Sequence, residues 1–286
     1  MFFLLLNLLS KIPFFRGKGR IFKFIITQYL KRGTPLVEVN GKLGKIKIDL
    51  RSLEWKYFCN RNYDEELMNE AFKLIDIDSI SMDVGANIGL WTIGIAQHIK
   101  NNNGKGQVFA FEPHPKNYQR LLENIEINGL RDYVSPHNIA LSNCKRTLKL
   151  VLREDFKNGG ETGNASVATS DEFDKGFESI DIQACQTDDF LTNQEINKIS
   201  FIKLDVEGHE DLFLEGATDL IKDHKPSICM EINIPFYKAR EIDNTIAEKF
   251  TSLLPNYSFK YDQYQTNDLK ELINSDLSDV FALPIK

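Results

Sequence analysis

Four acidic residues stand where predicted strands end or where the following turns begin: Asp83, Glu112, Asp205 and Glu231. In an open α/β sheet, ligands bind outside the carboxyl ends of the strands. Unpaired carboxylates repel each other, so a sequence that gathers them at one sheet edge indicates a site. Such carboxylates can accept hydrogen bonds from ligand hydroxyls or take up a proton.

The segment Asp83–Gly89 reads DVGANIG and predicts a loop that binds a nucleotide-containing cofactor. An alternating apolar strand is expected over 79–84 and an apolar helix over 89–99. Gly85 and Gly89 carry no Cβ, so a ligand can approach the backbone closely. The spacing differs from the G-x-G-x-x-G of dinucleotide binders, which disfavours a dehydrogenase. The alternative is an ordinary strand-to-helix turn.

Glu112 ends the next predicted strand, over 107–112, and lies 23 residues after Gly89. An acidic residue at about this distance from the loop binds ribose hydroxyls in α/β folds. A single carboxylate can accept from both hydroxyls of one ribose. The alternative is a solvated Glu at a strand end.

Two of these motifs resemble those of a known enzyme class. Asp83–Gly89 followed by Glu112-Pro113 is similar to the first two motifs of class I methyltransferases that depend on S-adenosylmethionine (SAM). Residues 201–210, FIKLDVEGHE, resemble the F-I-K-x-D-x-E-G-H-E signature of the FkbM family. Residues 187–190, 214–217 and 226–232 also resemble that family's pattern. The resemblance covers roughly residues 63 to 233 and implies SAM as cofactor and a hydroxyl acceptor on a sugar or natural product.

The resemblance also implies where the cofactor contacts lie. The ribose is expected at Glu112, and the alternative for Asn138 is a turn-forming role. Tyr63 and Glu66 precede the first core strand and are weaker candidates for covering the cofactor. The expected cofactor-binding residues are Asp83, Gly85, Asn87, Gly89, Glu112, Pro113, His114, Asn138, Ala140 and Asp205.

Methyl transfer to a hydroxyl requires removal of its proton, and three residues are assigned to the catalytic group. His209 is the candidate general base, because neutral imidazole has an unperturbed pKa of about 6.5. Its alternative is a His that only hydrogen-bonds a loop. Lys203 and Asp205 share one face of their strand. Lys203 is expected mainly to pair with Asp83, Asp205 or Glu231 and keep them ionised.

Glu207 and Glu231 are assigned to acceptor binding. For Glu207 an equal alternative is that it complements the N-terminus of the following helix. Asp205, His209 and Glu231 together offer ligands for a divalent metal. These ligands are scattered through the sequence and form no compact metal motif, so no metal is expected.

Strand and helix patterns alternate from about residue 79 onward. This alternation predicts a Rossmann-like α/β sheet, mostly parallel with an antiparallel edge strand and with helices on both faces. The expected segments are a basic apolar N-terminus (1–35), a hairpin and helix extension (36–75) and a SAM-dependent methyltransferase domain (76–286). The irregular stretch 157–176 is either a substrate lid or a disordered surface insertion.

The net charge of −6 argues against a nucleic-acid ligand. Two alternative functions stay open: a SAM-fold subunit that binds without catalysis, and a methyltransferase acting on protein or nucleic acid. The four cysteines form no C-x-x-C pair, which is typical of free thiols in a reducing, cytoplasmic setting. Oligomeric state is not predicted.

Residues 1–32 combine an apolar start with seven Lys or Arg and contain no Asp or Glu. Positive charge follows the apolar run, whereas a secretory signal has it first. This composition favours peripheral contact with the inner face of an anionic membrane. The alternative is a helix packed on the catalytic domain, or a frayed tail.

Overall fold

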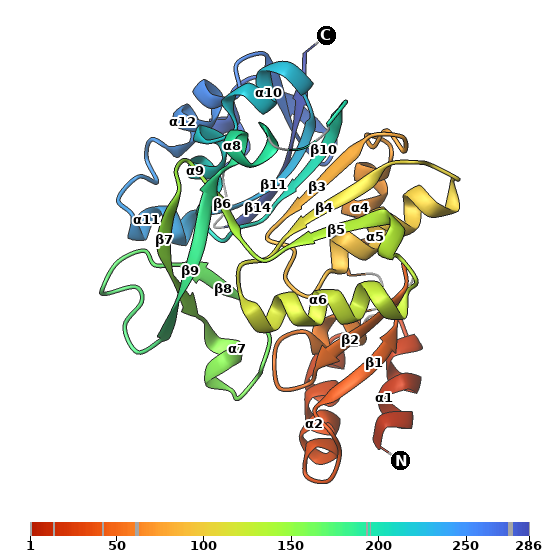
Figure 1. The fold of residues 1–286 in the computed structure, drawn as a ribbon. Coiled ribbons are helices and arrows are strands. Elements are labelled where there is room, and N and C mark those ends of the chain that lie inside the picture. The colour runs from red at the N-terminus through yellow and green to blue at the C-terminus, as the bar shows by residue number, and fades with distance from the viewer. Residues whose placement is uncertain are drawn as a thin grey trace.

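The computed structural model describes residues 2–13, 15–41, 43–60, 63–192, 194, 196–273 and 277–285. Its centre is an eight-stranded sheet in the order β13-β12-β14-β11-β10-β3-β4-β5 (Figure 1). The strands β11, β10, β3, β4 and β5 are paired in parallel. Strands β14, β12 and β13 extend the sheet from β11 through antiparallel pairs. The strands are β3 (Ile80–Val84), β4 (Gln107–Phe111), β5 (Val134–His137), β10 (Ile199–Leu204), β11 (Ser227–Asn233), β12 (Tyr257–Tyr261), β13 (Tyr264–Thr266) and β14 (Leu277–Pro284).

The predicted α/β sheet is therefore confirmed, and its antiparallel part is larger than one edge strand. Strands β12, β13 and β14 make up this antiparallel part. Strand β14 does not lie at the edge but between β12 and β11. This insertion brings the last strand of the chain beside the end of β11, where Asp279 is the register partner of Glu231.

Helices cover both faces of the sheet. Consecutive strand residues point to opposite faces, so each central strand presents apolar side chains to the helices on both sides. Phe201 packs with Trp91 and Leu121 on one face, and Ile202 packs with Phe213 and Phe250 on the other. The first face is covered by α4 (Glu65–Phe72), α5 (Leu90–Asn101) and α6 (Pro115–Ile127). The second is covered by α9 (Glu210–Glu215), α10 (Thr218–His224), α11 (Ile234–Ala239) and α12 (Ile246–Leu253).

A second, four-stranded sheet with the order β6-β9-β7-β8 stands beside the central one (Figure 1). Its strands are β6 (Ala140–Ser142), β7 (Arg146–Leu152), β8 (Ala165–Val167) and β9 (Glu178–Gln186), and α7 (Glu154–Lys157) and α8 (Thr187–Thr192) flank it. Short 3-10 turns occur at Arg131–Tyr133 and Leu269–Glu271.

Part of the irregular stretch 157–176 is built into the protein. Thr162 and Ser166 are buried. The Asn117 side chain donates to the carbonyl of Gly163 (2.9 Å) and accepts from its N–H (3.1 Å). Asp49 accepts from the N–H of Glu161 at 3.0 Å. These bonds fix residues 161–164 against α6 and the N-terminal extension.

The N-terminal extension lies at one end of the molecule (Figure 1). It contains α1 (Phe2–Lys11), α2 (Lys18–Leu30), α3 (Trp55–Cys59) and the hairpin of β1 (Leu36–Asn40) and β2 (Lys45–Asp49). This antiparallel hairpin lies in the stretch 36–75, where a hairpin was expected. Strand β2 is held to α6, since Asn124 and Asn128 accept from the N–H groups of Lys47 and Lys45, each at 2.8 Å. Within the described residues, no helix combines the length and apolar character needed to cross a bilayer.

Candidate active site

A cavity of about 260 Å³ opens at the carboxyl ends of β3, β4 and β10. Eleven of the fourteen residues assigned from sequence line it. Gly89, His114 and Asn138 do not. Residues that sequence reasoning left out also line it, among them Tyr57, Asp64, Asn117, Asn164 and Asp279. The open edge of the sheet therefore gathers the predicted residues into one site.

The loop after β3 is held in a fixed shape by the neighbouring strand. The N–H groups of Gly85 and Ala86 both donate to the carbonyl of Phe111, at 3.0 and 2.9 Å. Asp83 is buried and accepts from the hydroxyl of Thr92. Burial raises the pKa of Asp83 to about 6. Gly89 serves packing, since a Cβ there would lie 2.6 Å from the side chain of Leu121.

Glu112 is a fixed and buried acceptor. Its carboxylate accepts from the N–H of Asn87 (2.8 Å), the N–H of His114 (2.8 Å) and the amide of Asn117 (3.4 Å). Burial raises the pKa of Glu112 to about 7, against three donors that favour the ionised form. Asn138 donates to the carbonyls of Glu112 and Pro113. His114 and Asn138 thus support Glu112 from outside the cavity lining.

Asn164 connects the loop after β3 to the other end of the cavity. Its amide nitrogen donates to Glu207 at 3.1 Å, and its oxygen accepts from the amide of Asn87 at 3.4 Å. The remaining oxygen of Asn87, Oδ1, is buried without a partner among the described residues. Asn164 comes from the irregular segment, so its place could be learned only from the fold.

Lys203 is buried beneath the site and pairs with two acids. Its Nζ lies 3.2 Å from Asp205 and 3.7 Å from Asp279. The ring of Trp91 is 5.3 Å from the same atom. Burial opposes the charge on Lys203, but Asp205 and its neighbours hold the pKa of this amine well above its usual range. The pairing with Asp205 is one of the three expected from sequence, and Asp279 is an addition from β14.

The carboxylates of Asp205, Glu207 and Glu231, here called the carboxylate cluster, lie within 4.8 Å of one another. Burial, and then the charge of Asp205, raises the pKa of Glu207 and of Glu231. The cluster can therefore hold or accept a proton near neutral pH. Oxygen atoms so placed are also ligands that divalent cations prefer. This differs from the set considered from sequence, because Glu207 takes the place of His209.

His209 lies on the wall of the cavity toward β6. It is buried, and its Nε2 is 3.1 Å from the hydroxyl oxygen of Ser142. Burial, and then the charge of Arg240, lowers the pKa of His209 to about 4. The imidazole is thus neutral at physiological pH, and one of its two ring nitrogens is hydrogen-bonded to Ser142.

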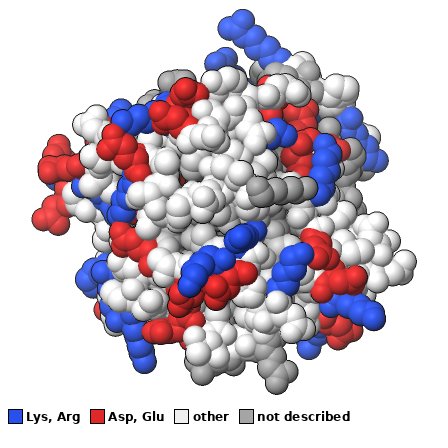
Figure 2. All heavy atoms as spheres, turned by 90° about the horizontal axis from the view of Figure 1, so that it is seen from above, with Lys and Arg blue, Asp and Glu red and all other residues white. Residues whose placement is uncertain are grey.

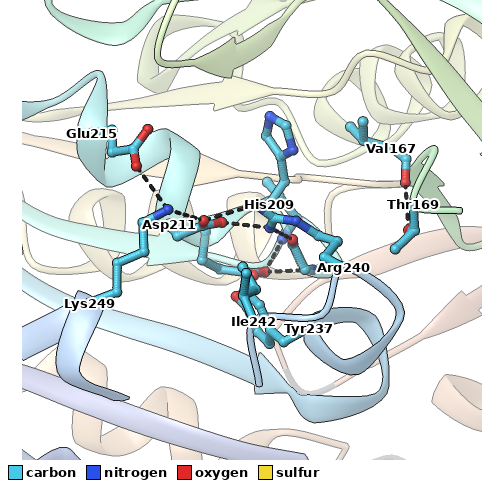
Figure 3. Close-up of polar contacts among 12 residues, drawn as sticks. Val167, Thr169, His209, Asp211, Glu215, Tyr237, Arg240, Ile242 and Lys249 are labelled. Atoms are coloured by element: carbon cyan, nitrogen blue, oxygen red, sulfur yellow. Dashed lines mark hydrogen bonds and ion pairs between the residues drawn. The ribbon is translucent and has the colours of Figure 1, made fainter. Parts of the chain in front are cut away.

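A network behind His209 anchors the turn that carries Asp205 and Glu207 (Figure 3). Arg240 donates to the carbonyl of Gly208 at 2.6 Å and to both carboxylate oxygens of Asp211 at 2.7 and 2.9 Å. Lys249 joins Asp211 to Glu215 at 2.6 and 2.8 Å. The spacing of these residues gives no sequence signal, so their role was missed.

The N-terminal extension completes the cavity wall. Tyr57 of α3 packs edge to face on Tyr63, with ring centroids 4.8 Å apart, and both line the cavity. Asp64 accepts from the indole N–H of Trp91 at 3.2 Å. Tyr63 is therefore at the site as proposed, whereas Glu66 is exposed and does not line the cavity.

A model of the methyltransferase FkbM domain matches residues 83–261. The chain belongs to the FkbM methyltransferase family. The hexuronic acid methyltransferase AglP of Haloferax volcanii is 26% identical over 191 residues, covering 67% of this chain and 71% of that protein. Methyltransferase sdnD of Sordaria araneosa is 24% identical over 185 residues, covering 55% of this chain and 68% of that protein.

Solved structures are similar at a greater distance. An FkbM methyltransferase from Methylobacillus flagellatus KT is 17% identical with a TM-score of 0.44, covering 79% of this chain and 52% of that chain. The chain thus spans about half the length of that solved protein. TYW2 of M. jannaschii, in complex with AdoMet, is 13% identical with a TM-score of 0.44, covering 87% and 84% of the two chains.

Family membership makes the protein a methyltransferase with SAM as its cofactor. The residues present fit this cofactor. Glu112 offers a fixed carboxylate to ribose hydroxyls, and the unpartnered Oδ1 of Asn87 offers an acceptor to an amino group. Asp83 and the backbone at Gly85 would surround the methionine part, while Pro113 and Ala140 line the cavity beyond Glu112.

Proposed function

We propose that this protein transfers a methyl group to a hydroxyl of a sugar, a glycan or a related natural product. The observation that carries the proposal is the carboxylate cluster, which shares one cavity with the cofactor-binding residues. Carboxylates suit a hydroxyl acceptor, because they accept its hydrogen bond and its proton. The name of one relative, a hexuronic acid methyltransferase, supports a sugar acceptor, and the name of the other supports methyl transfer.

SAM, when bound, supplies the methyl group from its sulfonium. The protein's part is to hold the acceptor hydroxyl in line and to take its proton. Glu207 and Glu231 are suited to take it in their ionised forms, because burial and the charge of Asp205 raise both pKa values and so make each ionised carboxylate a stronger base than an ordinary one. His209 is a weaker base, with a pKa lowered to about 4. Lys203 forms an ion pair with Asp205 at 3.2 Å and so fixes the position of this carboxylate.

The charge of the cavity bears on the choice of acceptor. Among the described residues, seven acidic side chains line it, and Lys203 is the single Lys or Arg that does so. A free hexuronate would bring another negative charge into this environment, which is unfavourable at short range. The proposal therefore favours an uncharged or amino-bearing sugar over the acidic sugar named for the archaeal relative.

The test compares Glu231→Gln with the wild type, measuring methyl transfer to a panel of neutral, amino and acidic sugars. We expect kcat to fall about a hundredfold or more in the variant, with SAM affinity unchanged by calorimetry. Glu66→Gln removes an exposed acid outside the cavity and serves as the matched control. SAM binding without transfer to any hydroxyl acceptor would favour a binding subunit or a protein or nucleic-acid target.

The same assay separates proton transfer from cation binding at the carboxylate cluster. If the cluster takes the proton, turnover survives a chelator. Turnover lost to the chelator and restored by Mg²⁺ would instead assign these three carboxylates to a divalent cation.

A further inference from the structure

Helices α1 and α2 form a helical hairpin at one end of the molecule (Figure 1). Leu6, Phe22 and Ile26 are buried on its inner side, against α3 and the strands β1 and β2. The rings of Phe22 and Phe58 meet edge to face, with centroids 5.2 Å apart. This packing fixes which side chains of the hairpin point outward.

The outward side chains form an apolar patch. Leu4, Leu8 and Ile12 follow one another at helical spacing of four residues and are 64%, 54% and 48% exposed. On α2, Ile21 is 47% and Phe24 is 65% exposed. Seven of the twelve exposed large hydrophobic side chains in the described part of the chain lie between residues 4 and 24. Apolar surface gathered in this way marks an interaction site.

The same hairpin is basic. Lys11, Arg16, Arg20 and Lys23 are exposed, and no Asp or Glu precedes Glu38 in a chain that carries 41 of them. The face of the molecule opposite the hairpin differs, because Lys and Arg alternate there with Asp and Glu (Figure 2). The hairpin thus differs from that face, because its basic side chains have no acidic ones between them.

The corner between the two helices is held in place by a buried cation. Lys18 is buried, and its Nζ donates to the carbonyls of Ile12 at 2.6 Å and of Ser10 at 3.4 Å. These carbonyls lie at the end of α1, where a positive charge also complements the helix dipole. The exposed apolar and basic side chains are thus presented by a defined structure.

We propose that the α1–α2 hairpin docks this protein on the surface of a membrane that contains anionic lipids. The apolar patch would enter the headgroup region, and the Lys and Arg side chains would meet lipid phosphates. A second copy of the chain fits less well, because a symmetric contact between two hairpins would bring like charges together. A bilayer surface offers apolar material and negative charge over the same area.

The hairpin is joined to the cavity by α3. Helix α3 contacts both α1 and α2, and its Tyr57 lines the cavity. Docking would place the hairpin and α3 between the lipid surface and the cavity. The proposal extends beyond methyl transfer and does not depend on it, because binding to lipid is measured without cofactor or acceptor.

The charge experiment uses the full chain and vesicles of phosphatidylcholine with or without phosphatidylglycerol. We expect flotation with the anionic vesicles at low salt, and release as salt rises. The triple variant Arg16→Gln, Arg20→Gln, Lys23→Gln should bind about a hundredfold more weakly. The control Lys73→Gln, Lys175→Gln, Lys222→Gln removes equal charge elsewhere and should bind as the wild type does. Equal binding to both vesicle types, or equal weakening of the two triple variants, would overturn the proposal.

The apolar contribution has its own pair of variants. Leu4→Ser, Leu8→Ser, Phe24→Ser should weaken binding to anionic vesicles, whereas Tyr261→Ser, an exposed aromatic on β12, should not. Thermal unfolding checks that each variant is folded. Light scattering measures self-association. A dimer that the apolar variant dissociates, together with no vesicle binding by the wild type, would assign the patch to a second copy and reject lipid.

Discussion

A Cβ atom on Gly85 would lie 1.8 Å from the carbonyl oxygen of Asp205. The loop after β3 and the turn after β10 are therefore in direct backbone contact. The N–H of Asp205 also donates to the carbonyl of Val84 at 2.9 Å. Because the first loop belongs to the cofactor end and the second carries Asp205 and Glu207 of the carboxylate cluster, displacing one loop displaces the other.

Replacing Gly85 with Ala should disrupt both ends of the site. Gly85 has a φ of +88°, which is unfavourable for Ala, and its Cβ would overlap the Asp205 backbone. We expect SAM affinity to fall more than tenfold, measured by calorimetry. Gly159→Ala is the matched control, because its φ is +81° and nothing lies within 4 Å of the new Cβ. Equal effects of the two changes would mean that the contact with Asp205 is unimportant.

Glu112→Gln should weaken SAM binding about tenfold to a hundredfold, since it removes a charged acceptor from the ribose hydroxyls. Burial raises the pKa of Glu112 to about 7 in the free protein. The ionised form is the better acceptor, so wild-type affinity should increase between pH 6 and pH 8. Calorimetry across this range checks both points. An unchanged affinity in the variant would remove Glu112 from the ribose site.

Glu54 is a buried acid outside the cavity, and its burial makes the free energy of unfolding depend on pH. It is buried beside α3, accepts from the N–H of Asp49 at 2.6 Å, and has a pKa raised by burial to about 7. The unfolded chain releases this proton near pH 4.5, so folding takes up a proton and stability falls as pH rises from 4.5 to 7. Above the pKa of Glu54 in the folded protein, this contribution of Glu54 to stability is fully lost.

Glu54→Gln should therefore stabilise the protein by about 1–3 kcal/mol at pH 8 and have little effect at pH 5. Urea unfolding at the two pH values measures this difference. The exposed Glu172→Gln variant controls for the loss of one negative charge. A variant less stable than the wild type at pH 8 would contradict the prediction.

Arg240→Ala should destabilise the protein by about 2–4 kcal/mol, because it removes a partner of the fully buried Asp211. It also leaves the carbonyl of Gly208 without its donor. Arg131→Ala breaks an exposed ion pair and should cost less than about 1 kcal/mol. Thermal or urea unfolding compares the two. If they were equally harmful, the network around Asp211 would have no special role in stability.

The cofactor end of the site could be predicted because its residues are close in sequence. Gly85, Asn87 and Glu112 lie on two consecutive strand-to-helix connections, whose pattern is set by local periodicity. The other end depends on pairings between distant segments. Asp279 reaches Lys203 because β14 inserts between β12 and β11. The alternation of apolar and polar residues in β14 predicts a strand but does not specify which strands it pairs with.

The strand pairing of the second sheet was also beyond sequence reasoning. Strand β9 alternates Ile180, Ile182 and Ala184 toward a small apolar cluster, but polar residues stand between them and Glu178 begins the strand. It pairs in parallel with β6, some forty residues earlier, and antiparallel with β7. Only this arrangement brings Asn164 beside Asn87 and Glu207.

The region shared with the family, residues 83–261, is shorter than the region that encloses the cavity. Tyr57, Tyr63 and Asp64 precede it, and Asp279 follows it, yet all four line the cavity. A fragment trimmed to the shared region would lose two walls of its reaction chamber. Changes in these flanks would therefore reshape the cavity wall without touching Glu112.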